Sequence, residues 1–408
     1  MSATPSPEAN LAAAPAEVQA ETRQAPHPVL EAPVRRRSAP LVLGILGIIV
    51  ASIAVVAVGI LFLVWLGPGF TAYAALLALI PLALVLLGVR WIDRWEPEPR
   101  GLLFFAFLWG AGMAVATALI VAFSIENAIP VDAVQSAQYD FVSSVVISPI
   151  VEETAKGLGV LLIFLFARRA FDGPVDGVVY AAVVAGGFAF TENIEYFAIE
   201  LSDPSGSISQ IFFIRGILSP FAHVMFTAMT GLFIGLAAQR GGRWLGVGGF
   251  FVGLIPAILL HALWNGALYV VNDFFAYYFL VQVPLFALAL TLVVLLRRRE
   301  VAITRNRLTE YAAAGWFNPG ELQTITTPAG RRVARSWAKA HGLGKLMSRY
   351  LTDATHLAFA RERIIRGRDL IGAQADEAAL LARVTESRRA LAAGIAATPG
   401  TQSTATAV

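Results

Sequence analysis

The chain has 408 residues, of which 57% are hydrophobic and only 14% are charged, against about a quarter charged in soluble domains. Its mean hydropathy of +0.67 favours a membrane protein. It contains no cysteine, which excludes a disulfide framework, a thiolate metal site and a cysteine nucleophile. The net charge is +3, but residues 297–408 carry 18 Lys and Arg against nine Asp and Glu. A basic segment therefore follows a hydrophobic one.

The N-terminal segment, residues 1–39, is rich in Ala, Pro and Glu without apolar periodicity, and we expect it to be disordered. Eight apolar runs follow, each close to the twenty or so residues that a membrane-spanning helix needs. The runs cover residues 41–66, 71–89, 101–123, 142–166, 176–198, 211–238, 245–270 and 275–296. The sequence thus predicts an all-α, polytopic membrane protein of about eight transmembrane helices.

The charges between the runs predict the orientation of the protein in the membrane. Arginines precede the first run and lie in the second, fourth and sixth connections and after the last run. The first, third, fifth and seventh connections contain no Lys or Arg. Because positively charged loops stay on the cytoplasmic side, this alternation places both termini in the cytoplasm.

The C-terminal segment is mixed in character. Proline-containing segments at 318–320 and 327–329 break regular structure. From about 333 to 392, apolar residues recur at helical spacing among charged ones, which predicts two or three amphipathic helices. We therefore divide the chain into a disordered segment 1–39, a transmembrane domain 40–298 and a cytoplasmic tail 299–408 that is partly helical. The basic balance favours anionic lipid headgroups as its partner, and no motif indicates nucleic acid.

Two adjacent glutamates, Glu152 and Glu153, lie about ten residues inside the fourth run. A carboxylate at this depth costs roughly 2.5–3.5 kcal/mol on insertion scales, so such residues usually serve a function. Lys156 lies one turn later, at i+4 from Glu152, where the two can form an ion pair. One carboxylate can then remain paired while the other acts as acid or base. A purely structural ion pair would explain one glutamate and the lysine, but not the second glutamate.

Two histidines, His223 and His261, lie in the sixth and seventh runs. Asn265 shares a helix face with His261, and its amide can orient an imidazole or bind an oxyanion. Each histidine alone could simply form a hydrogen bond between two helices. Together with the glutamates they form the set that binds zinc or activates water, and we take His223, His261 and Glu153 as the candidate metal ligands.

The fifth run brings Glu192 towards the same layer, with Tyr196 one turn later. By the predicted topology, the glutamates and histidines all lie between the midplane and the outer leaflet, at 1.5 Å of depth per residue. Arg215 of the next run is expected to pair with Glu195 or Glu200 at the outer interface, as a structural contact.

These motifs resemble those of a known family. The segments 152–156 (EETAK), 176–180 (DGVVY) and 188–196 (FAFTENIEY), with His223 and 261–265 (HALWN), look like the motif series of the PrsW family of bacterial intramembrane proteases. The segment 93–99 (DRWEPEP) also resembles that family, so the likeness covers about residues 90–270. The family is distantly similar to the type II CAAX prenyl proteases, which have Phe-x-x-x-His where this chain has Phe188-x-x-x-Glu192.

The resemblance implies a peptidase of the bacterial cytoplasmic membrane that cleaves a membrane-anchored protein, as in anti-sigma-factor release. In this hypothesis Glu152 or Glu153 activates water near the outer half of the bilayer. His223 and His261 assist as bases or as ligands of a metal such as zinc. Asn265 stabilises the oxyanion, and Glu192 is a further catalytic residue. Lys156 and Tyr196 support the catalytic residues.

Two other classes of protein use similar residues. A transporter or proton relay also needs buried Glu, His and Lys, but it predicts inverted repeats with paired broken helices, and the two halves of the chain show no such symmetry. A non-catalytic membrane scaffold predicts dispersed polar pairs, whereas these polar residues are expected in one layer.

Overall fold

The structure, a computed structural model, describes residues 38–368 and 370–396. The predicted disorder of residues 1–39 therefore falls almost entirely outside the described residues. The described chain forms two compact units. The membrane unit comprises residues 38–94 and 98–296, and the C-terminal unit comprises residues 95–97 and 297–396.

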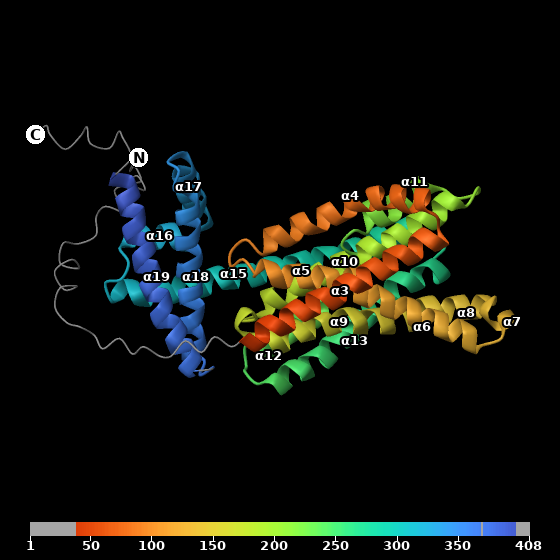
Figure 1. Cartoon of the computed structure of the whole chain (residues 1–408), viewed down its shortest axis with the longest axis horizontal. Helices are drawn as coiled ribbons and strands as arrows, with labels where there is room; N and C mark the ends of the chain where they lie inside the picture. Colours follow the sequence, from red (N-terminus) through yellow and green to blue (C-terminus); the bar gives the residue numbers. More distant parts are fainter. Residues whose placement is uncertain (1–37, 369, 397–408) are drawn as a thin grey trace, which may run out of the picture. The chain divides into compact units, whose positions relative to one another are not determined.

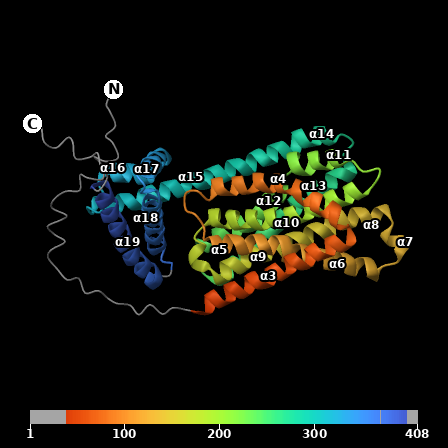
Figure 2. The same cartoon turned by 45° about the horizontal axis from the view of Figure 1, so that its top comes forward.

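The membrane unit consists of helices that run side by side in both views (Figures 1 and 2), and no strand occurs in the described part of the chain. Its elements are α3 (Ser38–Trp65), α4 (Pro68–Ile92), α5 (Arg100–Leu108), η1 (Trp109–Ala114), α6 (Val115–Ala128), α7 (Val131–Val134), α8 (Ala137–Val142), η2 (Ser143–Ile147), α9 (Ser148–Phe166), η3 (Arg168–Ala170), α10 (Pro174–Ser202), α11 (Ile208–Phe212), η4 (Phe213–Leu218), α12 (Ala222–Ala238), α13 (Arg243–Val270), α14 (Phe274–Tyr277), η5 (Tyr278–Gln282) and the start of α15 (Val283–Ala313).

Seven helices in the described residues are long and apolar enough to cross a membrane. They are Val42–Trp65, Pro68–Ile92, Arg100–Ala128, Pro174–Ser202, Ile208–Ala238, Arg243–Ala267 and Phe274–Ala313. The eighth expected span, 142–166, is also helical as η2 and α9, but it carries Glu152, Glu153 and Lys156, which are buried inside the unit. The predicted all-α, polytopic membrane fold is confirmed, and the cytoplasmic location of both termini stays a prediction.

Helix α10 is the most buried of the seven, and it packs against α4, α12 and η1. Glycine makes this packing close: a Cβ on Gly177 of α10 would lie 2.0 Å from the carbonyl oxygen of Gly231 of α12, and the converse distance is also 2.0 Å. Small residues allow such backbone contact between membrane helices. The contact fixes α10, which carries Glu192, against α12, which carries His223.

Several membrane helices contain a π-helical turn, and such turns are often found at functional sites. η2 directly precedes α9, and η4 lies before the break at Ser219. The Oγ and the N–H of Ser219 both donate to the Ile214 carbonyl, at 2.7 and 3.0 Å. Helix α12 then begins at Ala222. The break therefore places His223 in the first turn of a new helix.

The C-terminal unit contains the end of α15 followed by α16 (Pro319–Thr326), α17 (Pro328–Ala340), α18 (Gly344–Ile365) and α19 (Leu370–Ala396). The two prolines stand at the first helical position of α16 and α17, where a missing N–H costs nothing. Asn318 and Glu321 form a reciprocal capping box at the start of α16. The prediction of a helical, basic C-terminal segment is confirmed.

Trp95 belongs to the C-terminal unit although it lies between α4 and α5 in the sequence. Its indole N–H donates to Thr304 Oγ1 at 3.0 Å, and the Arg331 guanidinium lies 3.5 Å from the centre of its ring. Arg331, only 3% exposed, also donates to the Trp95 carbonyl at 3.0 Å and to Thr355 Oγ1 at 2.6 Å. Burial lowers the pKa of Arg331 to about 9, so it remains a cation at neutral pH.

Candidate active site

The site is built around one face of α9. The π-helical turn η2 leads directly into α9, and Pro149 lies in its first turn. Glu152, Glu153 and Lys156 then follow within about one turn, and all three side chains are buried. Lys156 Nζ lies 2.6 Å from Glu153 Oε1 and 3.5 Å from Glu152 Oε2. The lysine is therefore shared by both carboxylates, with Glu153 as the closer partner.

Glu153 is held on both of its oxygens. Besides Lys156, its Oε1 lies 3.0 Å from Nδ1 of His261, and its Oε2 accepts a hydrogen bond from Thr227 Oγ1 at 2.8 Å. Three helices, α9, α12 and α13, thus meet at this fully buried carboxylate. A carboxylate with this many partners is well suited to orienting other groups.

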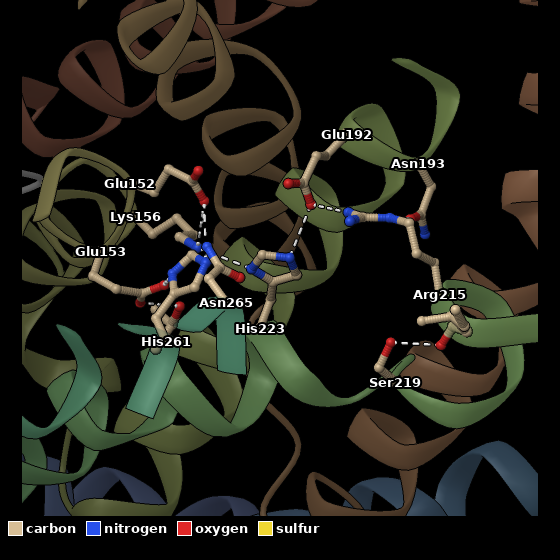
Figure 3. A network of polar contacts seen from close by, with 12 residues as sticks. Glu152, Glu153, Lys156, Glu192, Asn193, Arg215, Ser219, His223, His261 and Asn265 are labelled. Carbon is tan, nitrogen blue, oxygen red and sulfur yellow. Dashed lines mark hydrogen bonds and ion pairs between the residues drawn. The ribbon is translucent and has the colours of Figure 1, made fainter. Parts of the chain in front are cut away.

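His261 of α13 lies between the two glutamates (Figure 3). Because a carboxylate only accepts, Nδ1 of His261 donates to Glu153, and Nε2 is left as the acceptor nitrogen. Nε2 faces Glu152 Oε2 at 3.9 Å, too long for a hydrogen bond. Within the described residues Glu152 Oε2 is buried and accepts no hydrogen bond. The two acceptor atoms, Nε2 of His261 and Oε2 of Glu152, therefore face each other.

His223 of α12 links this group to Glu192 of α10. Its Nδ1 lies 3.2 Å from Lys156 Nζ, and its Nε2 lies 2.8 Å from Glu192 Oε2. The Lys156 ammonium only donates, so Nδ1 is the acceptor and Nε2 donates to Glu192. The rings of His223 and His261 lie 5.1 Å apart and nearly perpendicular. Four helices thus bring the six predicted Glu, Lys and His residues together.

The expected pairing of Arg215 with Glu195 or Glu200 is wrong. Arg215 forms an ion pair with Glu192, and its Nε donates to Asn193 Oδ1 at 2.9 Å. The π-helical turn η4 carries Arg215, so it faces the site side of α10. Glu200 instead accepts from the backbone N–H of Ser207.

Asn265 and Tyr196 lie at the margin of the site. Asn265 Nδ2 donates to the Ser144 carbonyl in η2 at 2.8 Å, so one of its amide protons holds the turn that leads into α9. The ring of Tyr196 lies 4.0 Å from the Arg215 guanidinium, and the residue is 44% exposed. In the described part of the chain Tyr196 therefore packs against Arg215, the partner of Glu192, and forms no hydrogen bond with a glutamate or histidine of the site.

Among the residues that the structure describes, one group of side chains could hold a metal ion: Glu152, His223 and His261 each offer one atom, and these atoms lie within 4.8 Å of one another. The expected ligand set had Glu153 in place of Glu152, and the structure differs because both oxygens of Glu153 are already bonded. Zinc holds its ligands tetrahedrally at about 2.0–2.2 Å, so two ligand atoms lie roughly 3.3–3.6 Å apart. The group fits zinc after a small side-chain movement.

The carboxylate behind His261 also fits a metal site. Metal-binding histidines usually donate their second nitrogen to a carboxylate, which fixes the tautomer, as Glu153 does for His261. His223 fits less directly, because both of its nitrogens have partners. A metal ion bound by His223 would have to displace Lys156 or Glu192 from it.

The sequence interpretation missed one residue of the site, Thr227, and it assigned Arg215 the wrong partner. Thr227 follows His223 by four residues, the same spacing that joins Glu152 to Lys156 and His261 to Asn265. That repeated i, i+4 pattern is the signal that could have identified it. No local pattern distinguishes Glu192 from Glu195 as the partner of Arg215.

Comparisons with known proteins identify the relatives of this chain. Residues 98–289 match the PrsW family, described as a family of intramembrane metalloproteases. The protein named Protease PrsW from Clostridioides difficile (strain 630) is 31% identical over 194 residues, which are 47% of this chain and 76% of that protein. The protein of the same name from Geobacillus kaustophilus (strain HTA426) is 27% identical over 146 residues, 36% of this chain and 58% of its own. No solved structure matches the chain.

Proposed function

Because the chain belongs to the PrsW family of intramembrane proteases, we propose that Glu152 is the group that activates water for attack on a peptide carbonyl. The observation that carries this proposal is the difference between its two glutamates. Glu153 is bonded on both oxygens, whereas Oε2 of Glu152 accepts no hydrogen bond from a described residue. A general base needs a free oxygen within reach of the water.

Glu153 and Lys156 are then the supporting pair. Glu153 fixes the tautomer and orientation of His261, and Lys156 compensates the charge of both glutamates. His261 directs its acceptor nitrogen towards Glu152. A water molecule between these two groups would have two acceptors for its protons, which favours the activated form of the water.

His223, Asn265 and Glu192 have roles beside the base, at the lysine and at the oxyanion. The proton that Glu152 takes from the water is the one passed to the leaving amine. His223, a neutral imidazole whose single proton is bonded to Glu192, aligns the Lys156 ammonium beside the two glutamates. Asn265 uses one amide proton on the Ser144 carbonyl, and the second can stabilise an oxyanion. Glu192 keeps His223 in place.

A zinc ion, if bound, would be held by Glu152, His223 and His261, and it would supply Lewis-acid polarisation of the peptide carbonyl. The donor set supports this alternative, as does the buried Oε2 of Glu152, which accepts no hydrogen bond from a described residue and lies 3.5 Å from the Lys156 ammonium. Glu153 orients His261 in both versions of the site.

The substrate we propose is a membrane-anchored protein of the anti-sigma-factor type, cut in or near the outer half of the bilayer of a bacterial cytoplasmic membrane. The predicted topology and depth support this position. A scissile carbonyl inside a stable helix is occupied by a backbone hydrogen bond, so the substrate must unwind there. We further propose residues 40–298 as the peptidase domain and 299–408 as a cytoplasmic tail.

The test is cleavage of a single-span, membrane-anchored substrate labelled at both ends, by the purified full chain in lipid nanodiscs. The new termini are identified by mass spectrometry, and bound metal is measured on the same sample. We expect cuts within or just outside the outer half of the span. Cuts at the cytoplasmic end would contradict the topology, and a metal-free, chelator-resistant active enzyme would contradict the zinc version while leaving Glu152 as the base.

A further inference from the structure

Arg215 is a partly buried cation at the edge of the site, and the proposed reaction does not use it. It lies in η4, four residues before the helix break at Ser219. Its side chain is 18% exposed. An arginine at membrane depth is costly unless it is paired, so its contacts indicate why it is there.

Three residues of α10 contact the guanidinium of Arg215, and Figure 3 shows two of them, Glu192 and Asn193, beside it. It is paired with Glu192, it donates from Nε to Asn193 Oδ1 at 2.9 Å, and it covers the ring of Tyr196 at 4.0 Å. Glu192 and Asn193 thus hold the edge of the Arg215 guanidinium, and the ring of Tyr196 packs against its face. Arginine is suited to this arrangement because its fork of donors is rigid, whereas lysine has a single ammonium.

The decisive atom is Oε2 of Glu192. It accepts from Arg215 Nη2 on one side and from His223 Nε2 on the other. In the described part of the chain Arg215 forms no hydrogen bond or close ion pair with His223 or with the glutamates of α9, although its charge also acts on Glu152 at longer range. Its effect on the orientation of the His223 ring therefore passes through Glu192.

We propose that Arg215 is a positioning residue: it holds Glu192 in the one orientation that keeps the His223 ring aligned with Lys156 and the cleavage site. This inference rests on the proposed function. The chain of contacts is Arg215 to Glu192, Glu192 to His223, and His223 to Lys156 at 3.2 Å. Without the guanidinium, the Glu192 carboxylate can rotate and the imidazole loses its fixed acceptor.

The experiment compares Arg215→Ala and Arg215→Lys with Glu195→Gln as the matched control, using kcat and KM for the labelled substrate in nanodiscs. Glu195 lies on the same helix, one turn from Glu192, and its charge acts on Glu192 and Arg215 without a hydrogen bond or ion pair to either in the described residues, so its substitution changes the local charge but none of these contacts. We expect Arg215→Ala to lower kcat by about 10- to 100-fold with KM nearly unchanged, as is usual when the partner of a site histidine is lost. Arg215→Lys should recover part of that loss, and Glu195→Gln should keep the wild-type kcat.

The double variant Glu192→Gln/Arg215→Ala separates positioning from general destabilisation. If Arg215 acts through Glu192, the double variant loses no more activity than Glu192→Gln alone, because the second change removes nothing further. Additive losses, or an Arg215→Ala kcat within twofold of wild type, overturn the inference. If Arg215→Ala fails to insert, the Arg215→Lys and Glu192→Gln variants carry the same comparison.

The control Glu152→Gln separates this inference from the proposed function. If Glu152→Gln is inactive while Arg215→Ala is fully active, Arg215 has no positioning role and Glu152 remains the proposed base. A fully active Glu152→Gln removes the proposed base, whatever Arg215 does.

Discussion

Nδ1 of His261 lies 3.0 Å from Oε1 of Glu153, although 108 residues separate the two in the chain. This single bond decides which nitrogen of His261 is left for chemistry, because the proton on Nδ1 leaves Nε2 as the acceptor. It also assigns the two neighbouring glutamates different tasks. Glu153 orients the histidine, and Glu152 is left facing its free nitrogen.

The two glutamates should therefore respond differently to the same substitution. Glu152→Gln should lower the cleavage rate by at least about 100-fold with little change in the unfolding temperature, since an amide keeps the shape but cannot take a proton. Glu153→Gln should lower both activity and unfolding temperature, because buried Lys156 loses its closest counter-charge. Cleavage assays and thermal unfolding of the same preparations measure both quantities.

The control for this pair is Glu126→Gln, an exposed glutamate of α6, which should change neither quantity. Full activity of Glu152→Gln would contradict its assignment as the base. An unchanged unfolding temperature of Glu153→Gln would contradict its assignment as the orienting carboxylate.

The close approach of α10 and α12 predicts a severe effect of one methyl group. In Gly177→Ala the new Cβ would lie 2.0 Å from the carbonyl oxygen of Gly231, so the helices must separate. Overpacking of this kind costs typically about 1–3 kcal/mol, and it moves His223 relative to Glu192. We expect loss of stability together with loss of activity.

Gly248→Ala is the matched control for Gly177→Ala, because a Cβ on Gly248 of α13 meets no atom within 4 Å. Unfolding temperature and cleavage rate should stay at the wild-type values. A Gly177→Ala protein that behaves like Gly248→Ala would show that the two backbones are not in contact.

Two adjacent arginines of α17 offer a test of the C-terminal unit. Arg331→Ala removes the partner of the Trp95 carbonyl and of Thr355, and leaving such buried groups unpaired costs about 1–3 kcal/mol each. Arg332→Ala changes an exposed side chain and should stay within about 0.5 kcal/mol. Equal unfolding temperatures for the two variants would mean that the Trp95–Arg331 contact does not form.

Asp93 predicts a pH dependence of stability. Burial raises its pKa to about 6, although the Glu98 backbone N–H donates to it at 2.9 Å. The folded protein therefore binds this proton more tightly than the unfolded chain, so the contribution to stability is present below about pH 4 and is lost as the pH rises through 6. It amounts to at most about 3 kcal/mol, and less because the side chain is only half-buried.

Asp93→Asn should remove this pH dependence and raise the unfolding temperature at pH 7.5, since the amide keeps the acceptor for Glu98 without the charge. The exposed Asp132 provides the comparison: Asp132→Asn should unfold like the wild type. An Asp93→Asn protein less stable than wild type at pH 7.5 would contradict the sign of the effect.

Much of the fold could be predicted because membrane helices are determined by local properties. The length of each apolar run predicts a span, and i, i+4 spacing on α9 predicts the contact of Glu152 with Lys156 without any tertiary information. The alternating charges and the resulting depths place His223 and His261 at the level of the glutamates. The structure brings these residues into one group.

The contacts between helices could not be predicted in the same way. Whether Arg215 reaches Glu192 or Glu195 depends on the rotation of two helices, which the π-helical turn η4 changes. The same applies to the metal ligands, because Glu152 and Glu153 are neighbours in sequence and differ only in the direction of their side chains. No sequence pattern predicts the contact between Trp95 and Arg331.

The Trp95–Arg331 contact has a consequence for synthesis of the protein. The two residues are 236 positions apart, which is roughly 10–50 s of translation at 5–20 residues per second. During this interval α4 and α5 can already be in the membrane, while Arg331, the partner of the tryptophan between them, has not yet been synthesised. A ribosome stalled before codon 331 would therefore leave a nascent chain with an exposed indole, a recognisable mark for chaperones and quality-control proteases.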